Sequence, residues 1–173
     1  ILMVSPTRPL TEQHFHSFRR FLKVEGMVMF SGSMKPAMRV EEWKNARIVF
    51  STPQTINNDL QKERYDLSDV ALLIVDEAHR SVGDYAYTGI LSHYEGHVLA
   101  LTASPGGDSK KIMEVIENLD VDNIEVRTSA DDDVKDHVKG IDIEWRRTEL
   151  PGDMKEIKAL VDDFLQERVR KLR

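Results

Sequence analysis

The sequence predicts a parallel α/β sheet covered by helices, and three observations lead to that fold class. Short apolar runs alternate with helix-like segments, and each run is followed at once by small or polar residues. The runs are apolar at every position, which suits strands that are buried on both faces. Strand alternating with helix implies right-handed crossovers and ligand sites beyond the carboxyl ends of the strands. The five runs are Ile1–Val4, Val28–Phe30, Ile48–Phe50, Val70–Val75 and Val98–Leu101.

The segments between these runs repeat apolar residues with the period of an α-helix, so that the repeated side chains share one face. The two clearest stripes are Phe15, Phe18 and Leu22, and Ile112, Ile116 and Leu119.

Two further strands and a long terminal helix are expected after the fifth run. A sixth strand is expected at Asn123–Arg127, and alternating apolar residues predict another at Gly140–Thr148. Asp153 and Glu156 resemble a capping box that opens a helix. We therefore expect one α/β domain over residues 1–150 and a C-terminal helix over 151–173. The apolar stripe of this helix consists of Met154, Ile157, Val161, Phe164, Leu165 and Leu172.

Composition excludes several classes of protein. The chain has 173 residues, a net charge of −6 and no cysteine, which rules out a disulfide scaffold and a thiolate zinc site. No apolar run reaches the length of a membrane span, and no signal peptide is visible, so we expect a cytoplasmic protein without membrane contact. The acidic balance argues mildly against a dedicated nucleic-acid module, but it permits a local basic strip around Arg8, Lys35, Arg39 and Arg80.

The fourth apolar run ends in two adjacent carboxylates, Asp76 and Glu77, followed by Ala78, His79 and Arg80. Two acids at the mouth of a buried strand are costly unless they meet a cation or do chemistry. A Walker B strand needs this arrangement, because one carboxylate serves the magnesium of a nucleoside triphosphate and the other serves the attacking water. The alternative is a solvated strand end with no such role.

Four stretches, each at the end of a predicted strand, carry a family resemblance. With these stretches in the family's order, the chain resembles superfamily 2 DExH-box helicases. More closely, it resembles the archaeal Hef and Fanconi-anaemia M-type DNA helicase-translocases. The resemblance implies a RecA-like domain of the P-loop NTPase type. The matching stretches are Ser5–Leu10 with Gln13 and His14, Ser51–Thr55 with Asn58–Leu60, Val75–Arg80, and Leu101–Gly106.

The resemblance assigns roles to the last two stretches, which match motifs II and III. Asp76 would hold Mg²⁺ through water, and Glu77 would polarise the water that attacks the γ-phosphate of ATP. His79 would couple the nucleotide site to Thr102 and Ser104, whose hydroxyls can bond His79 or Asp76. The alternatives are a salt-linked strand end for Glu77 and His79, and ordinary turn chemistry for Thr102 and Ser104.

The first two stretches match motifs Ia and Ib, which the family uses to grip nucleic acid. Hydroxyls, backbone amides and helix N-termini hold phosphates without reading bases. The alternative is that the prolines only start helices. The candidate residues are Pro6, Thr7, Arg8, Thr52, Pro53 and Gln54. The histidines outside the Asp-Glu-Ala-His stretch, His14 among them, are interpreted as ordinary polar positions rather than a metal site.

No Gly-Lys-Thr or Gly-Lys-Ser occurs in the chain, so the Walker A loop of the family is missing, together with its helical insert and second motor domain. We therefore expect part of an ATP-dependent helicase or translocase that acts on branched or forked DNA, inactive by itself. The alternative is a truncated RecA-like module that binds nucleic acid or a partner without turnover. The preference for DNA over RNA rests on the resemblance alone. The apolar stripe of the C-terminal helix must fold back on the α/β domain or pair with another chain, and an open sheet edge gives a second reason to associate, so we expect a homodimer.

Overall fold

The computed structural model describes residues 1–83, 85–104, 109–128, 131–132, 134, 144–146, 148–149 and 151–171. The chain divides into two compact units, Ile1–Glu125 and Val126–Arg173, and the elements of each unit are described separately.

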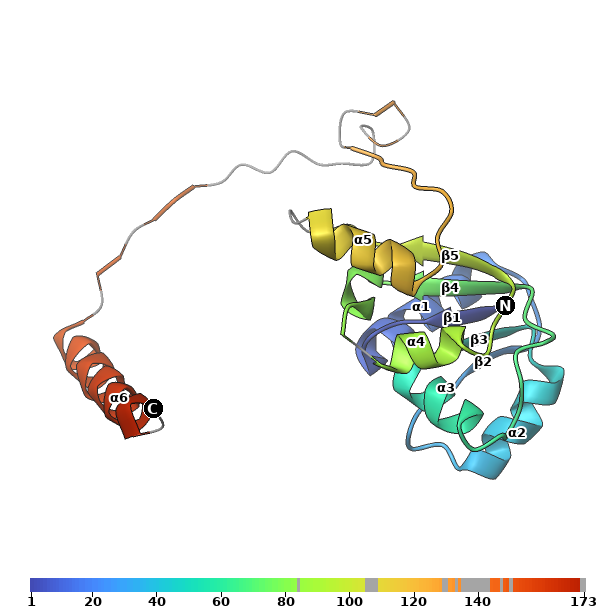
Figure 1. Ribbon diagram of the computed structural model, residues 1–173, viewed down its shortest axis with the longest axis horizontal. Helices are drawn as coiled ribbons and strands as arrows, with labels where there is room; N and C mark the ends of the chain where they lie inside the picture. Colours follow the sequence, from blue (N-terminus) through green and yellow to red (C-terminus); the bar gives the residue numbers. More distant parts are fainter. Residues whose placement is uncertain are drawn as a thin grey trace. The chain divides into compact units, whose positions relative to one another are not determined.

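The first unit is built on a five-stranded sheet in which every neighbouring pair of strands is parallel (Figure 1). The strand order is β2-β3-β1-β4-β5, which confirms the predicted fold class. Each predicted run corresponds to a strand, with ends displaced by at most two residues. The strands are β1 (Leu2–Val4), β2 (Met27–Met29), β3 (Ile48–Ser51), β4 (Leu72–Asp76) and β5 (His97–Leu101).

Helices follow the strands and connect them. Prolines stand at the starts of the helices after β1, β2 and β3, where the missing N–H of proline costs nothing. In the first unit the helices are α1 (Arg8–Phe21), α2 (Pro36–Asn45), α3 (Pro53–Leu60), the short 3₁₀ helix η1 (Ala78–Ser81), α4 (Tyr85–Leu91) and α5 (Ser109–Asn118).

The two faces of the sheet bury different sets of side chains, because successive strand residues point to opposite faces. Leu2 and Val4 face a cluster that includes Ile56 of α3 and Tyr87 of α4. Met3, on the other face, belongs to a second cluster with Phe50, against which Phe15 and Phe18 of α1 pack. Both phenylalanines of α1 meet the Phe50 ring edge-on, at 5.8 and 5.2 Å between ring centroids. Phe15 and Phe18 of the predicted stripe thus pack on the sheet, whereas Leu22 is the C-cap residue of α1 and is 43% exposed.

The strand order decides which polar strand ends become neighbours. Since all the strands are parallel, the residues that follow them meet at one edge of the sheet. Along that edge the order is the segment after β2, the segment after β3, the segment after β1, then Asp76 at the end of β4 and Thr102 after β5. The motif Ia and Ib segments therefore lie side by side, and Asp76 lies next to Thr102.

The strand predicted at Asn123–Arg127 is not formed. Residues 121–128 are neither strand nor helix, and Ile124 is 64% exposed. A segment forms a strand only where a neighbouring strand takes up its backbone hydrogen bonds, and no described strand pairs with this one. The strand expected at Gly140–Thr148 lies largely outside the described residues.

The second unit contains helix α6 (Gly152–Lys171), as the apolar stripe predicted. The helix begins one residue before Asp153, which therefore lies in its first turn. Ile157, Val161 and Phe164 are exposed, so no described residue of this unit covers the stripe. The expectation that protein covers this face stays a prediction. Among the described residues, no helix has the length and apolar character needed to cross a membrane.

Candidate functional site

The two carboxylates after β4 differ in backbone conformation. Asp76 is the last residue of the strand, whereas Glu77 adopts the left-handed region with φ 51° and ψ 47°. That region is uncommon for a residue with a side chain, and it is concentrated at functional sites. The turn at Glu77 starts η1, in which the N–H of Arg80 donates to the carbonyl of Glu77 at 2.9 Å. The two acids thus stand at the mouth of the strand in different backbone conformations.

Asp76 has a partner that the sequence interpretation missed. The Nε2 atom of His14, on α1, lies 2.7 Å from Oδ2 of Asp76, and both side chains are partly buried. The two residues are 62 positions apart, and they meet because β1, which precedes α1, is the neighbour of β4. The only sequence signal was the place of His14 within the motif Ia stretch. This bond orients Asp76 and leaves its other oxygen, Oδ1, for a ligand.

Glu77, His79, Thr102 and Ser104 form a second polar chain. The Nδ1 atom of His79 lies 3.2 Å from Oε2 of Glu77 and 2.9 Å from Oγ1 of Thr102. The backbone N–H of Ser104 donates to the same Thr102 oxygen at 3.2 Å. Nδ1 of His79 thus lies within reach of both the Glu77 carboxylate and the Thr102 hydroxyl. The structure therefore links β4 to the segment after β5 through His79.

This arrangement refines the expectation for the Thr-Ala-Ser segment. Thr102 supplies the hydroxyl that bonds His79, and Ser104 contacts the same oxygen through its backbone N–H rather than its hydroxyl. The parallel register explains the pairing, because Asp76 is aligned with Leu101 and the next residues, Glu77 and Thr102, follow as neighbours.

The motif Ia and Ib residues lie at the starts of two helices. Thr7 is the N-cap residue of α1 and Thr52 that of α3, and neither threonine side chain makes a capping hydrogen bond. Neither helix has an acid in its first turn. The hydroxyl of Thr52 instead pairs with that of Thr55 at 3.0 Å. Two adjacent helix starts that lack a side-chain cap and an acidic residue favour an anion such as a phosphate.

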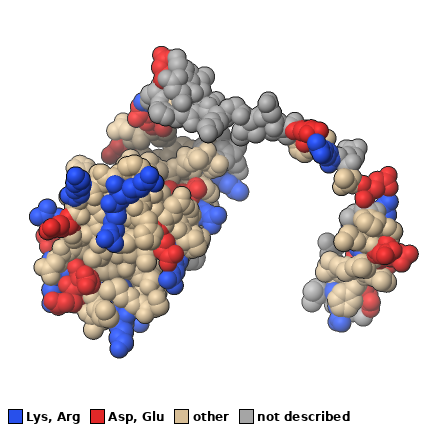
Figure 2. Space-filling view, turned by 180° about the vertical axis from the view of Figure 1, so that it is seen from behind, with Lys and Arg blue, Asp and Glu red and all other residues tan. Residues whose placement is uncertain are grey.

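The basic strip suggested by the sequence is incomplete. Arg8 is exposed, but its Nε donates to Oε1 of Glu12 at 2.8 Å, one helical turn away. Arg39 is only 5% exposed and is therefore a buried residue rather than part of a surface strip. Figure 2 shows basic and acidic side chains interspersed with other residues on the face that it views, rather than a continuous basic strip.

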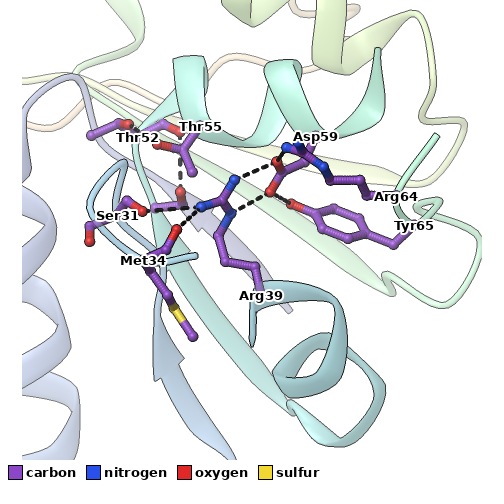
Figure 3. Close-up of polar contacts among 9 residues, drawn as sticks. Ser31, Met34, Arg39, Thr52, Thr55, Asp59, Arg64 and Tyr65 are labelled. Atoms are coloured by element: carbon purple, nitrogen blue, oxygen red, sulfur yellow. Dashed lines mark hydrogen bonds and ion pairs between the residues drawn. The ribbon is translucent and has the colours of Figure 1, made fainter. Parts of the chain in front are cut away.

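Arg39 belongs instead to a buried ionic cluster around Asp59 (Figure 3). Its Nε and Nη2 atoms donate to the two oxygens of the Asp59 carboxylate, each at 2.6 Å. Arg64 also donates to Asp59, and the hydroxyl of Tyr65 does so at 2.9 Å. Asp59 is 0% exposed, so the carboxylate is stable there only because these donors surround it. The sequence interpretation erred because a residue type does not reveal whether its side chain is buried.

The electrostatics of this cluster follow from burial and pairing. Burial alone would raise the pKa of Asp59, but its bonds from Arg39, Arg64 and Tyr65 outweigh that effect and lower it. The hydrogen bond to Asp59 raises the pKa of Arg39. Burial, and then the neighbouring Asp59 charge, raise the pKa of the Tyr65 phenol strongly. The cluster is therefore an arginine–carboxylate pair that stays ionised beside a neutral tyrosine.

The donor set at the end of β4 suits magnesium better than a transition metal. Mg²⁺ binds through one or two carboxylates together with water and substrate phosphates, and Asp76 offers one free oxygen for that purpose. Among the described residues, no group of three or more histidines, cysteines or acids converges as a protein-only metal site. The metal and the nucleotide would then have to bind together.

Comparisons with known proteins identify a matching family model and several similar proteins. The model of the family described as DEAD/DEAH box helicase matches residues 1–112. A Methanocaldococcus jannaschii protein named as an ATP-dependent RNA helicase, MJ1505, is 37% identical over the whole of this chain, which covers 23% of that protein. The ATP-dependent DNA helicase mph1 of Sclerotinia sclerotiorum is 39% identical over 83% of this chain and 12% of its own length.

Solved structures show the same relation. The crystal structure of the Pyrococcus furiosus Hef helicase domain superposes with a TM-score of 0.77 at 42% identity, over 99% of this chain and 37% of the Hef chain. The chain thus spans less than half the length of each of these proteins.

Proposed function

Because this chain belongs to the DEAD/DEAH box helicase family, we propose that it forms part of an ATP-dependent DNA helicase or translocase. The observation that carries the proposal is the edge of the sheet on which Asp76, Glu77, His79 and Thr102 are brought together. The two uncapped helix starts on the same edge supply a place for a nucleic-acid backbone.

The residues of this edge have separate roles in the proposal. Asp76, oriented by His14, would hold the magnesium of ATP, which neutralises charge on the phosphates. Glu77 would accept a proton from the attacking water, and its backbone adopts the left-handed region directly after the strand. His79 and Thr102 would pass the state of the nucleotide to the neighbouring strand through their hydrogen bond.

The test uses a chimera in which residues 1–173 replace the matching segment of the Hef helicase domain. The Hef portion supplies the parts of a helicase that this chain does not contain. Glu77→Gln in the chimera should lower kcat for ATP hydrolysis by about 10²- to 10⁴-fold, since the carboxylate acts in the transition state. ATP affinity should stay close to that of the unsubstituted chimera.

Two controls accompany this measurement. Residues 1–173 alone should show no turnover, because no segment of the sequence replaces a phosphate-binding loop. A Glu77→Gln chimera with near-normal kcat would remove the role of Glu77. Steady hydrolysis by the isolated chain that Asp76→Ala abolishes would show that a phosphate loop is not needed.

For the substrate, we infer forked or branched DNA. The fungal relative is named a DNA helicase, and the Hef helicase domain is 42% identical to this chain with a TM-score of 0.77. The competing candidate is RNA, which the name of the M. jannaschii relative carries. Unwinding by the chimera should be compared on forked DNA, linear duplex DNA and duplex RNA. A preference for duplex RNA would contradict the inference.

A further inference from the structure

The buried Arg39–Asp59 pair joins two segments that both reach the proposed nucleic-acid edge. Besides its two bonds to Asp59, Arg39 donates from Nη1 to the carbonyl of Met34 and, at 3.4 Å, to that of Ser31. Ser31 and Met34 belong to the loop between β2 and α2, and Asp59 belongs to α3 (Figure 3). One guanidinium therefore uses all of its nitrogens to fasten this loop, residues 31–34, to α3.

Loop 31–34, which Arg39 holds against α3, lies at the same edge of the sheet as the start of α3. Met29 of β2 is aligned with Phe50 of β3, so the loop leaves the sheet beside Thr52 and the start of α3. The hydroxyls of Ser31 and Ser33 lie 2.9 Å apart and are not buried, and a Cβ on Gly32 would meet nothing within 4 Å. We call the Arg39–Asp59 pair the clamp. The clamp is buried, whereas the loop surface that it holds in place is exposed.

Stability alone does not account for a pair of this kind. Replacing a buried ion pair with apolar residues is often neutral or stabilising, since desolvation of the charges offsets their attraction. The two parallel hydrogen bonds from the Arg39 guanidinium to the Asp59 carboxylate form a fork. These bonds are directional, however, and they fix the relative position of the two groups.

We propose that Arg39 and Asp59 are positioning residues that hold loop 31–34 beside the start of α3, so that both contact one nucleic-acid backbone. The inference rests on the proposed function, because it concerns the same edge of the sheet. Arg39 touches no phosphate itself. Its effect passes through the loop carbonyls on one side and through α3 on the other.

The test measures binding of a fluorescein-labelled single-stranded DNA of mixed sequence to residues 1–173 over a range of salt concentrations. Arg39→Lys keeps the net charge but loses the fork, and Asp59→Asn makes the protein more positive by one charge. If only net charge mattered, Arg39→Lys would bind DNA with the affinity of wild type, and Asp59→Asn would bind it more tightly. The clamp predicts that both variants bind at least about fivefold more weakly, the loss expected from one ordinary hydrogen bond.

Three comparisons separate positioning from folding and from direct contact. Tyr65→Phe removes a bond to Asp59 without touching loop 31–34, so it should bind DNA like wild type even where it destabilises the domain. Arg8→Ala, which removes an exposed cation, should lower the salt slope by about one, whereas Arg39→Lys should leave the slope unchanged. Backbone amides of residues 31–35 should exchange hydrogen faster in Arg39→Lys, while those of β1 and β4 do not.

Each remaining outcome is decisive. If wild type binds and Arg39→Lys and Asp59→Asn bind equally well, the clamp is wrong and the proposed function stands. If wild type shows no salt-sensitive binding, both are wrong. Should the single variants not fold, Arg39→Met combined with Asp59→Leu removes the fork and the buried charges together, and wild-type affinity in that folded protein would overturn the clamp.

Discussion

At the scale of single residues, the role of each charged side chain depends on the groups that it contacts. Asp76 and Asp59 are both carboxylates, but Asp76 has one histidine partner and a free oxygen, whereas Asp59 is surrounded by three donors. A ligand can reach the first and not the second. The same logic separates Arg8, which is exposed beside Glu12, from Arg39, which is buried.

Tyr65 makes the buried cluster measurable through pH. Burial and the Asp59 charge raise its pKa, so above pH ~10, the ordinary tyrosine value, the unfolded chain loses a proton that the folded chain keeps. The free energy of unfolding should then fall as pH rises, by up to about 1.4 kcal/mol per pH unit from this group. Below that pH the phenol is protonated in both states and contributes no slope.

The corresponding measurement is urea unfolding of wild type and Tyr65→Phe between neutral and strongly alkaline pH. The variant should be less stable at neutral pH and should lose stability more gradually above pH ~10. Parallel curves for the two proteins over the alkaline range would mean that Tyr65 ionises equally in both states.

At the scale of elements, the sheet edge depends on how tightly helices α3 and α4 pack. A Cβ added to Gly89 of α4 would lie 2.2 Å from Oδ1 of Asn57, which is a buried residue of α3. Two helices that approach so closely leave no space for a methyl group. Since α3 also carries Thr52 at its start, any shift of α3 would move the proposed phosphate contact.

Gly89→Ala is therefore expected to destabilise the domain although alanine is the better helix former. Alanine in place of glycine favours a helix by about 1 kcal/mol, but the overpacking should cost about 1–3 kcal/mol. The net loss, up to about 2 kcal/mol, can be measured by chemical denaturation. Gly32→Ala is the matched control, because its Cβ meets nothing and its stability should change by less than about 0.5 kcal/mol. A more stable Gly89→Ala protein would contradict the close packing.

At the scale of the whole molecule, helix α6 presents an apolar stripe that the described residues of its own unit leave exposed, with Phe164 at 55%. Apolar stripes of this size are rarely left in water, so we expect the stripe to be covered by protein and the chain to dimerise. Sedimentation velocity of residues 1–173 over a range of concentrations tests this.

Substitutions on opposite sides of α6 sharpen the experiment. Phe164→Glu places a charge on the stripe and should shift the chain to monomer. Ala159→Glu adds the same charge on the opposite side of the helix and should leave the association unchanged. A wild-type protein that is monomeric at every concentration would refute the expectation of a dimer.

The sequence by itself determined the features that depend on a short stretch of residues, namely the strands and the polar residues at their ends. Five apolar runs became five parallel strands, and the Asp-Glu-Ala-His stretch stands at the end of one of them, since burial patterns and strand ends are local features. The strand expected at Asn123–Arg127 is not formed, because a strand also needs a neighbouring strand, and a short stretch of residues does not encode that neighbour.

Only the tertiary structure decided which distant residues meet. The strand order brings His14 against Asp76 across 62 positions, and helix packing buries Arg39 against Asp59. Neither pairing leaves a trace in local composition, because the environment of a side chain is set by the elements that pack around it. An arginine that looked like a free cation in the sequence is therefore the fastener of a loop, and a histidine that looked ordinary orients the proposed magnesium ligand.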